Sequence, residues 1–159
     1  MLYYQGYSIS FQEVPDEITL VILIADCPYR CPGCHSPDLQ EAKGKDLEKD
    51  ILSIIDEYSD AITCVCLMGD GQDRRAVIRC AKIIKSLGFK SALYTGKNES
   101  DAIVYLEDFD YLKYGPYVES LGGLDSEDTN QHMLKVTKRF DRTGVSFEDI
   151  TYKFKHNYE

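Results

Sequence analysis

Apolar runs separated by helix-periodic segments dominate the chain between residues 18 and 114. Residues 18–25 are almost all apolar and rich in β-branched side chains, which is typical of a strand covered on both faces. Residues 2–14 alternate in character and indicate one or two antiparallel strands that precede it. Later apolar runs predict three further strands, at 61–68, 90–94 and 109–114.

Helical spacing is found between these strands. Apolar residues recur every three or four positions over 47–58, and Asp46 is placed to cap the first turn. A second helix covers the apolar positions from 77 to 87 and ends at Gly88, and a third, short helix is expected over 100–106. Strands that alternate with helices predict an α/β fold with a mainly parallel sheet, open or rolled toward a barrel.

The rest of the chain has weaker periodicity. Residues from 122 onward are expected to form a loop followed by an edge element at 133–136, and the polar segment 138–159 is expected to have a mobile end. No linker-like stretch divides the 159 residues, which suffice for one domain with a core over 15–135. We therefore expect a single domain over 1–159.

Charge and composition narrow the classes of partner. The chain carries 18 basic and 27 acidic residues, a net charge of -9, which argues against nucleic acid or an anionic membrane as its main partner. Residues 1–6 lack a basic segment, and no stretch approaches about 18 apolar residues, so we expect a cytoplasmic protein. In that compartment six cysteines favour a metal or redox role over a disulfide framework.

Three thiols follow the first predicted strand within one short loop: Cys27, Cys31 and Cys34. Residue chemistry leaves open a structural zinc site, reactive thiols without metal, and an iron-sulfur cluster. Zinc needs a fourth ligand, and His35 follows Cys34 so directly that both rarely reach one tetrahedral ion. His132 and His156 are more distant candidates for that ligand.

An iron-sulfur cluster normally takes four cysteine ligands. The other three thiols share a predicted strand face or the apolar side of a predicted helix, so we expect them to be buried core residues: Cys64, Cys66 and Cys80. The three-cysteine loop would then leave one iron open to a substrate, which favours the iron-sulfur interpretation.

Active sites of parallel sheets collect at the carboxyl ends of the strands. Unusual loops follow all four predicted strands, and we expect them to form one site at a common rim. These are the cysteine loop, Gly69-Asp70-Gly71, Tyr94-Thr95-Gly96 and residues 113–117.

The Cys-x3-Cys-x2-Cys spacing resembles the radical S-adenosylmethionine superfamily. More narrowly, Cys31-Pro32-Gly33-Cys34-His35 is similar to the Cys-Pro-Gly-Cys-aromatic loop of the activating proteins of anaerobic ribonucleoside-triphosphate reductase. The likeness extends to three further segments and spans 15–135. These segments are residues 63–70, Leu93-Tyr94-Thr95-Gly96 and Asn130-Gln131.

This resemblance implies an incomplete α/β barrel of the radical S-adenosylmethionine type, in which Cys27, Cys31 and Cys34 bind a [4Fe-4S] cluster. It further implies an oxidoreductase that cleaves S-adenosylmethionine to a 5'-deoxyadenosyl radical and installs a glycyl radical on the reductase. The implied partners are that reductase and a one-electron donor such as flavodoxin or ferredoxin. The alternatives are an activase of another glycyl radical enzyme and a non-catalytic zinc or iron-sulfur module.

The resemblance also implies the residues around the cofactor. Gly33 and His35 flank Cys34, where backbone groups can approach the cofactor. The Gly69-Asp70-Gly71 turn would bind the methionine amino group, with an ordinary helix-capping turn as its alternative. Lys113 would serve the cofactor carboxylate or be solvated, and Tyr94 would line the pocket or the core.

Two segments depart from the family pattern. Met68-Gly69-Asp70-Gly71 stands where the family has Gly-Gly-acid, so the acid is shifted by one position or Gly69 alone keeps the contact. Tyr114-Gly115-Pro116-Tyr117 stands where the family commonly has Asp-Gly-basic-aromatic, so Pro116 replaces a basic residue.

Overall fold

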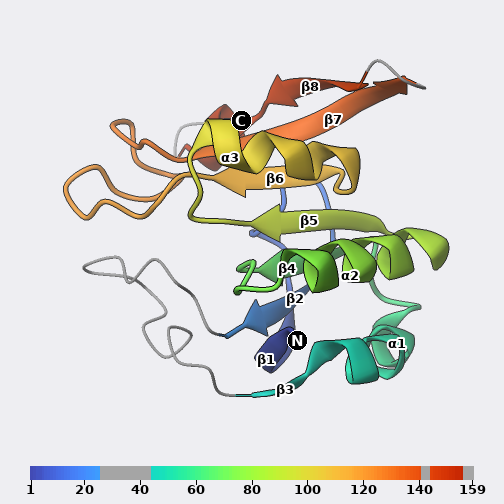
Figure 1. Cartoon of the computed structure of the whole chain (residues 1–159). Coiled ribbons are helices and arrows are strands. Elements are labelled where there is room, and N and C mark those ends of the chain that lie inside the picture. The colour runs from blue at the N-terminus through green and yellow to red at the C-terminus, as the bar shows by residue number, and fades with distance from the viewer. Residues whose placement is uncertain (26–43, 141–143, 156–159) are drawn as a thin grey trace.

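One eight-stranded sheet organises residues 1–25, 44–140 and 144–155, the part of the chain that the computed structural model describes (Figure 1). The strands are β1 (Tyr3–Ser10), β2 (Thr19–Ile24), β3 (Lys45–Asp46), β4 (Cys64–Met68), β5 (Lys90–Tyr94), β6 (Tyr111–Tyr114), β7 (His132–Phe140) and β8 (Gly144–Asp149). The helices are α1 (Leu47–Tyr58), α2 (Arg74–Ser86) and α3 (Glu99–Ala102), with 3₁₀ helices η2 (Ile103–Glu107) and η3 (Thr151–Phe154).

The sheet is mixed and open, with the order β3-β1-β2-β4-β5-β6-β7-β8. Its centre is parallel, because β4 pairs in parallel with β2 and β5, and β5 pairs in parallel with β6. The flanks are antiparallel, through the pairs of β1 with β2 and β3 and of β7 with β6 and β8. Figure 1 shows this order as a ladder from β3 to β8.

The expected mainly parallel sheet of an incomplete barrel is therefore wrong. Four of the seven pairings are antiparallel, and β3 and β8 lie at opposite ends of the strand order. The error arises mainly after β6, where one edge element was expected and the hairpin of β7 and β8 is found. Strand β8 is exposed at most of its positions, so it lacks the apolar alternation that marks a half-buried strand.

The predictions for the central elements are confirmed. Strands β2, β4, β5 and β6 fall within or at the predicted apolar runs, and α1 begins at Leu47. Asp46 caps α1 by accepting a hydrogen bond from the Glu48 backbone N–H at 3.1 Å, and Asp73 caps α2 through the Ala76 N–H at 3.1 Å.

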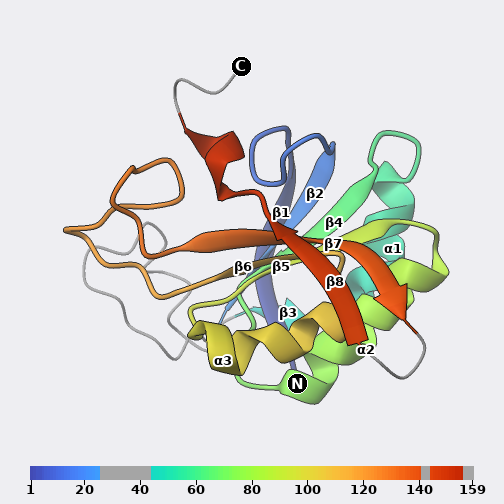
Figure 2. The same cartoon turned by 90° about the horizontal axis from the view of Figure 1, so that it is seen from above.

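Helices α1, α2 and α3 cover one face of the sheet, and loop segments together with η3 cover the other (Figures 1 and 2). On the helix side, apolar residues of α1 and α2 such as Ile51 and Val77 pack with Ile22 and Leu67 of the strands. The opposite face carries a smaller cluster, which Val14 and Ile150 help to cover. Adjacent residues of β2 thus enter two different clusters, which explains its unbroken apolar run.

Removing the cap of α1 should measurably destabilise the protein. We expect Asp46→Ala to lower the free energy of unfolding by about 1 kcal/mol, because the Glu48 N–H loses its acceptor at a helix end. Urea denaturation followed by far-ultraviolet circular dichroism measures this change. Asp60→Ala is the matched control at an exposed position and should stay within about 0.5 kcal/mol. Equal losses in both variants would contradict the capping role.

Candidate functional site

The turn after β4 lies against the end of β2. Gly69 and Gly71 have φ angles of 113° and 55°, which L side chains rarely adopt. A Cβ on Gly69 would lie 3.4 Å from Ile24, and one on Gly71 would lie 3.4 Å from the Ala25 carbonyl oxygen. The two glycines therefore bring the turn close to the last described residues before the cysteine loop.

Asp70 projects a buried carboxylate between these glycines. Its relative exposure is 4%, and its Oδ2 atom accepts a hydrogen bond from the Thr95 hydroxyl at 3.1 Å. The Lys97 ammonium lies 3.3 Å from the same oxygen, and the Lys97 backbone N–H donates to Thr95 Oγ1 at 3.1 Å. A buried charge requires such compensation, so we define Asp70, Thr95 and Lys97 as the rim cluster.

Backbone hydrogen bonds hold the rim cluster to neighbouring strands. The Gly69 N–H donates to the Tyr94 carbonyl at 2.9 Å, and the Thr95 N–H donates to the Lys113 carbonyl at 2.9 Å. The Gly115 N–H in turn donates to the Lys97 carbonyl at 2.8 Å. The ends of β4, β5 and β6 are thereby linked in one row, as expected for parallel strands.

The amide side chains of Asn130 and Gln131 support the loop after β6. Asn130 Nδ2 donates to the Pro116 carbonyl at 3.0 Å, and Gln131 Nε2 donates to the Gly115 carbonyl at 3.4 Å. Asn130 Oδ1 is buried and accepts no hydrogen bond within the part of the chain that is described. Asn130 and Gln131 therefore hold in place the backbone of Gly115 and Pro116, directly after β6.

Tyr94 and Lys113 lie on the other face of the sheet. Tyr94 packs against the smaller apolar cluster, its hydroxyl donates to the Glu13 carbonyl, and burial raises its pKa well above the usual value. The Lys113 ammonium lies 5.5 Å from the centre of the Tyr94 ring. Because side chains alternate along a strand, Thr95 turns toward Asp70 while Tyr94 turns away.

The sequence places the Tyr94-Thr95-Gly96 turn at the expected rim but predicts no individual role for Thr95, and it does not include Lys97. Thr95 stands within the Tyr-Thr-Gly turn that was quoted for the resemblance, so that turn was a usable signal. Lys97 has no comparable signal. Its contact with Asp70 joins two turns that are far apart in the chain, and only the pairing of β4 with β5 brings them together.

The remaining predicted site residues lie outside the described ranges: Cys27, Cys31, Gly33, Cys34 and His35. Within residues 1–25, 44–140 and 144–155, no group of three His, Cys, Asp or Glu side chains is arranged to hold a metal ion. His132, once a distant candidate for zinc, places Nδ1 2.8 Å from Asp149 Oδ2 and stacks on Tyr114 at 5.2 Å. His156 also lies outside the described part.

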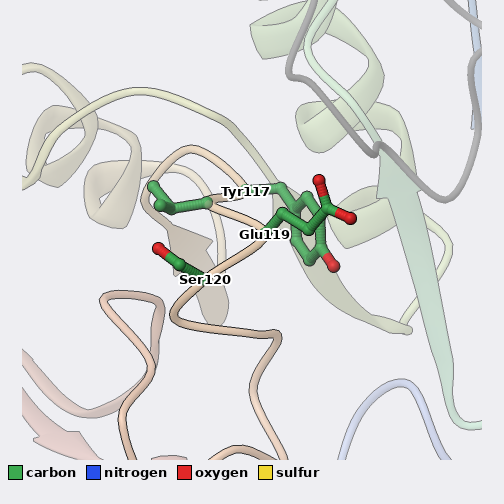
Figure 3. Close-up of a pocket in the computed structure, with 4 residues that line it drawn as sticks. Tyr117, Glu119 and Ser120 are labelled. Carbon is green, nitrogen blue, oxygen red and sulfur yellow. The ribbon is translucent and has the colours of Figure 1, made fainter.

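A depression in the loop after β6 is lined by four consecutive residues: Tyr117, Val118, Glu119 and Ser120. Figure 3 shows the side chains of Tyr117, Glu119 and Ser120 projecting from this loop. Because these walls come from one segment, the depression does not connect the strand ends. The rim cluster remains the better candidate for the site.

Comparison of the chain with models of known families, with curated proteins and with solved structures gives no match. None of the helices described here is both long enough and apolar enough to cross a membrane. The candidate site is therefore defined by its residue types and their geometry.

Cys64, Cys66 and Cys80 are free and fully buried, which confirms their predicted place in the core. Burial raises the pKa of all three thiols, that of Cys80 to about 12. We expect them to resist iodoacetamide in the native protein at pH 8 and to react in urea, because the thiolate is the nucleophile. Peptide mapping by mass spectrometry reads each position. Alkylation of native Cys64 as fast as in urea would contradict this burial.

Proposed function

We propose that this protein binds a [4Fe-4S] cluster and S-adenosylmethionine and generates the glycyl radical of an anaerobic ribonucleoside-triphosphate reductase. One observation carries the proposal. The Gly69-Asp70-Gly71 turn lies close to Ile24 and Ala25, the last described residues before Cys27, and presents a buried carboxylate with an ammonium partner. A site of suitable charge thus adjoins the point where the three-cysteine loop begins.

The rim cluster fits the amino-acid end of S-adenosylmethionine. That end carries an ammonium and a carboxylate, and Asp70 and Lys97 offer the two complementary charges. Without a ligand, the Asp70 carboxylate and the Lys97 ammonium pair with each other. The buried charge of Asp70 therefore keeps a partner. Thr95 orients the Asp70 carboxylate through its hydroxyl. The glycines allow close approach of the backbone on either side.

The donor set of the cysteine loop also fits. Cys27, Cys31 and Cys34 would bind three irons as thiolates, and burial raises the pKa of the Cys64 and Cys66 thiols, which makes them poorly suited to bind the fourth iron. When bound, the cluster and S-adenosylmethionine supply a 5'-deoxyadenosyl radical, formed with methionine by one added electron, which removes a hydrogen atom from a glycine. The residues of the chain would bind and orient the cluster and S-adenosylmethionine and exclude water from them.

The candidate site lies at the parallel centre of an open, mixed sheet. It needs only the carboxyl ends of β2, β4, β5 and β6 on one edge, and the antiparallel flanks leave that edge unchanged. The reductase and a one-electron donor such as flavodoxin or ferredoxin are the partners we propose. We place the reaction in the cytoplasm, where clustered thiols stay reduced and available to iron.

Anaerobic reconstitution with iron and sulfide tests the cofactor. We expect about four irons and four sulfides per chain, and 5'-deoxyadenosine when dithionite and S-adenosylmethionine are added. Ala in place of Cys27, Cys31 or Cys34 should abolish both, because each removes a cluster ligand. Cys64→Ala is the matched control, which should keep the cluster while losing some stability. Tightly bound zinc without cofactor cleavage would overturn the proposal in favour of a non-catalytic module.

The substrate is tested by electron paramagnetic resonance. Mixing the reduced, loaded protein with an anaerobic ribonucleotide reductase should give a glycyl doublet. A doublet with a different glycyl radical enzyme, and none with the reductase, would assign the protein to that enzyme.

The rim cluster has its own test. We expect Asp70→Asn to weaken S-adenosylmethionine binding by about tenfold or more, since one hydrogen bond to a charged group contributes roughly 1.5–3 kcal/mol. Equilibrium dialysis of reconstituted protein measures the affinity. The variant should keep its fold, because an asparagine oxygen can still accept from Thr95. Asp101→Asn, on the exposed side of α3, is the control. Equal affinities of the two variants for S-adenosylmethionine would show that Asp70 does not take part in binding it.

A further inference from the structure

Helix α2 concentrates positive charge in an acidic protein. Its sequence, RRAVIRCAKIIKS, contains five basic residues and no acidic one, while the whole chain has a net charge of -9. Its apolar residues Val77, Cys80 and Ile84 are buried against the sheet. The basic residues therefore lie on the outward side of a helix that covers the sheet (Figure 1).

Two of the five basic residues are engaged within the fold. Arg79 forms two hydrogen bonds with the Glu48 carboxylate at 2.7 and 2.9 Å. The Arg74 guanidinium lies 5.7 Å from the centre of the Tyr105 ring. These contacts join α2 to α1 and to η2, so they contribute to the structure of the helical layer.

Arg75, Lys82 and Lys85 form what we call the basic face of α2. All three are exposed, and none makes an ion pair with the described part of the chain. Arg75 and Lys82 are seven positions apart, which places them on one side of the helix, and Lys85 is one turn beyond Lys82. Like charges at such spacing destabilise a helix slightly. The helix dipole favours Lys85 in the last turn of α2 but disfavours Arg75 in the first turn, so helix stability explains only part of the basic face.

We propose that the basic face of α2 docks the acidic surface of the small redox protein that delivers the electron. This inference rests on the proposed function, which requires such a donor. Helix α2 begins at Arg74, three residues after Gly71, so its first turn lies near the candidate site. A protein docked along α2 would lie beside the residues proposed to hold the cofactor.

An electron-carrier complex suits the size and charge of this face. Such encounters are brief, bury little surface and are steered by complementary charges. Helix α2 has 13 residues, about 20 Å of helix at 1.5 Å per residue, which matches a small interface. Leu87, 42% exposed just after α2, adds an apolar contact of the kind found in protein interfaces. Nucleic acid is the weaker candidate, since the rest of the chain would repel its phosphates.

A charge-reversal pair tests the docking face. The test variant is Arg75→Glu with Lys82→Glu, and the control is Lys49→Glu with Lys138→Glu, which changes the net charge equally at exposed positions outside α2. Binding of oxidised flavodoxin to the reconstituted full chain is measured by fluorescence titration at low salt. We expect at least about tenfold weaker binding for the test variant and less than about twofold for the control. Added salt should weaken binding of the unaltered protein.

A second measurement separates this inference from the proposed function. With dithionite as reductant, both variants should form 5'-deoxyadenosine at the rate of the unaltered protein, whereas reduced flavodoxin should support the test variant poorly. Equal flavodoxin affinity in the test variant and unaltered protein would overturn the docking face, as would an equal loss in the control. Failure of the unaltered protein to cleave S-adenosylmethionine with dithionite would instead overturn the proposed function.

Discussion

The backbone hydrogen bonds between parallel strands are the constraint on which the rest of this structure depends. Parallel neighbours cannot be joined by a tight hairpin, so the chain crosses over between β4 and β5 through α2 and between β5 and β6 through α3 and η2. The crossovers bury apolar residues on one face of the sheet. Because these strands run in one direction, the turns that follow β4, β5 and β6 leave from the same edge, and polar residues from distant parts of the chain meet there.

A buried carboxylate gives that edge its chemical character. Asp70 is almost fully buried, and an unpaired charge at such a position would be strongly unfavourable. Thr95 and Lys97 compensate it, and the backbone bonds among the strand ends hold all three residues in place. A ligand with one positive and one negative group can exchange with this internal pair without leaving either charge unpaired. The features that stabilise the rim are therefore also the ones on which we base the proposal that it binds an amino-acid head group.

The antiparallel flanks extend the sheet on both sides without changing the edge that carries the rim cluster. Arg139 of β7 donates to the carbonyl oxygens of Leu106 and Phe109 at 2.6 and 3.0 Å, which ties the β7–β8 hairpin to the residues around η2. Strand β1 separates the parallel centre from the short edge strand β3. Helix α2 remains exposed on its outward side, and its positive charge faces away from the apolar core.

Sequence by itself determined the central strands, the first two crossover helices with the Asp46 cap, and the buried state of Cys64, Cys66 and Cys80. These features depend on local periodicity, capping and apolar runs, which are properties of short segments. Tertiary structure alone decided that the sheet is open and mixed, because the exposed strand β8 carries no apolar signal. It alone decided that Lys97 meets Asp70 and that Tyr94 and Lys113 turn to the opposite face. Those outcomes depend on strand pairing between distant segments, and no local pattern in the chain records which strands become neighbours.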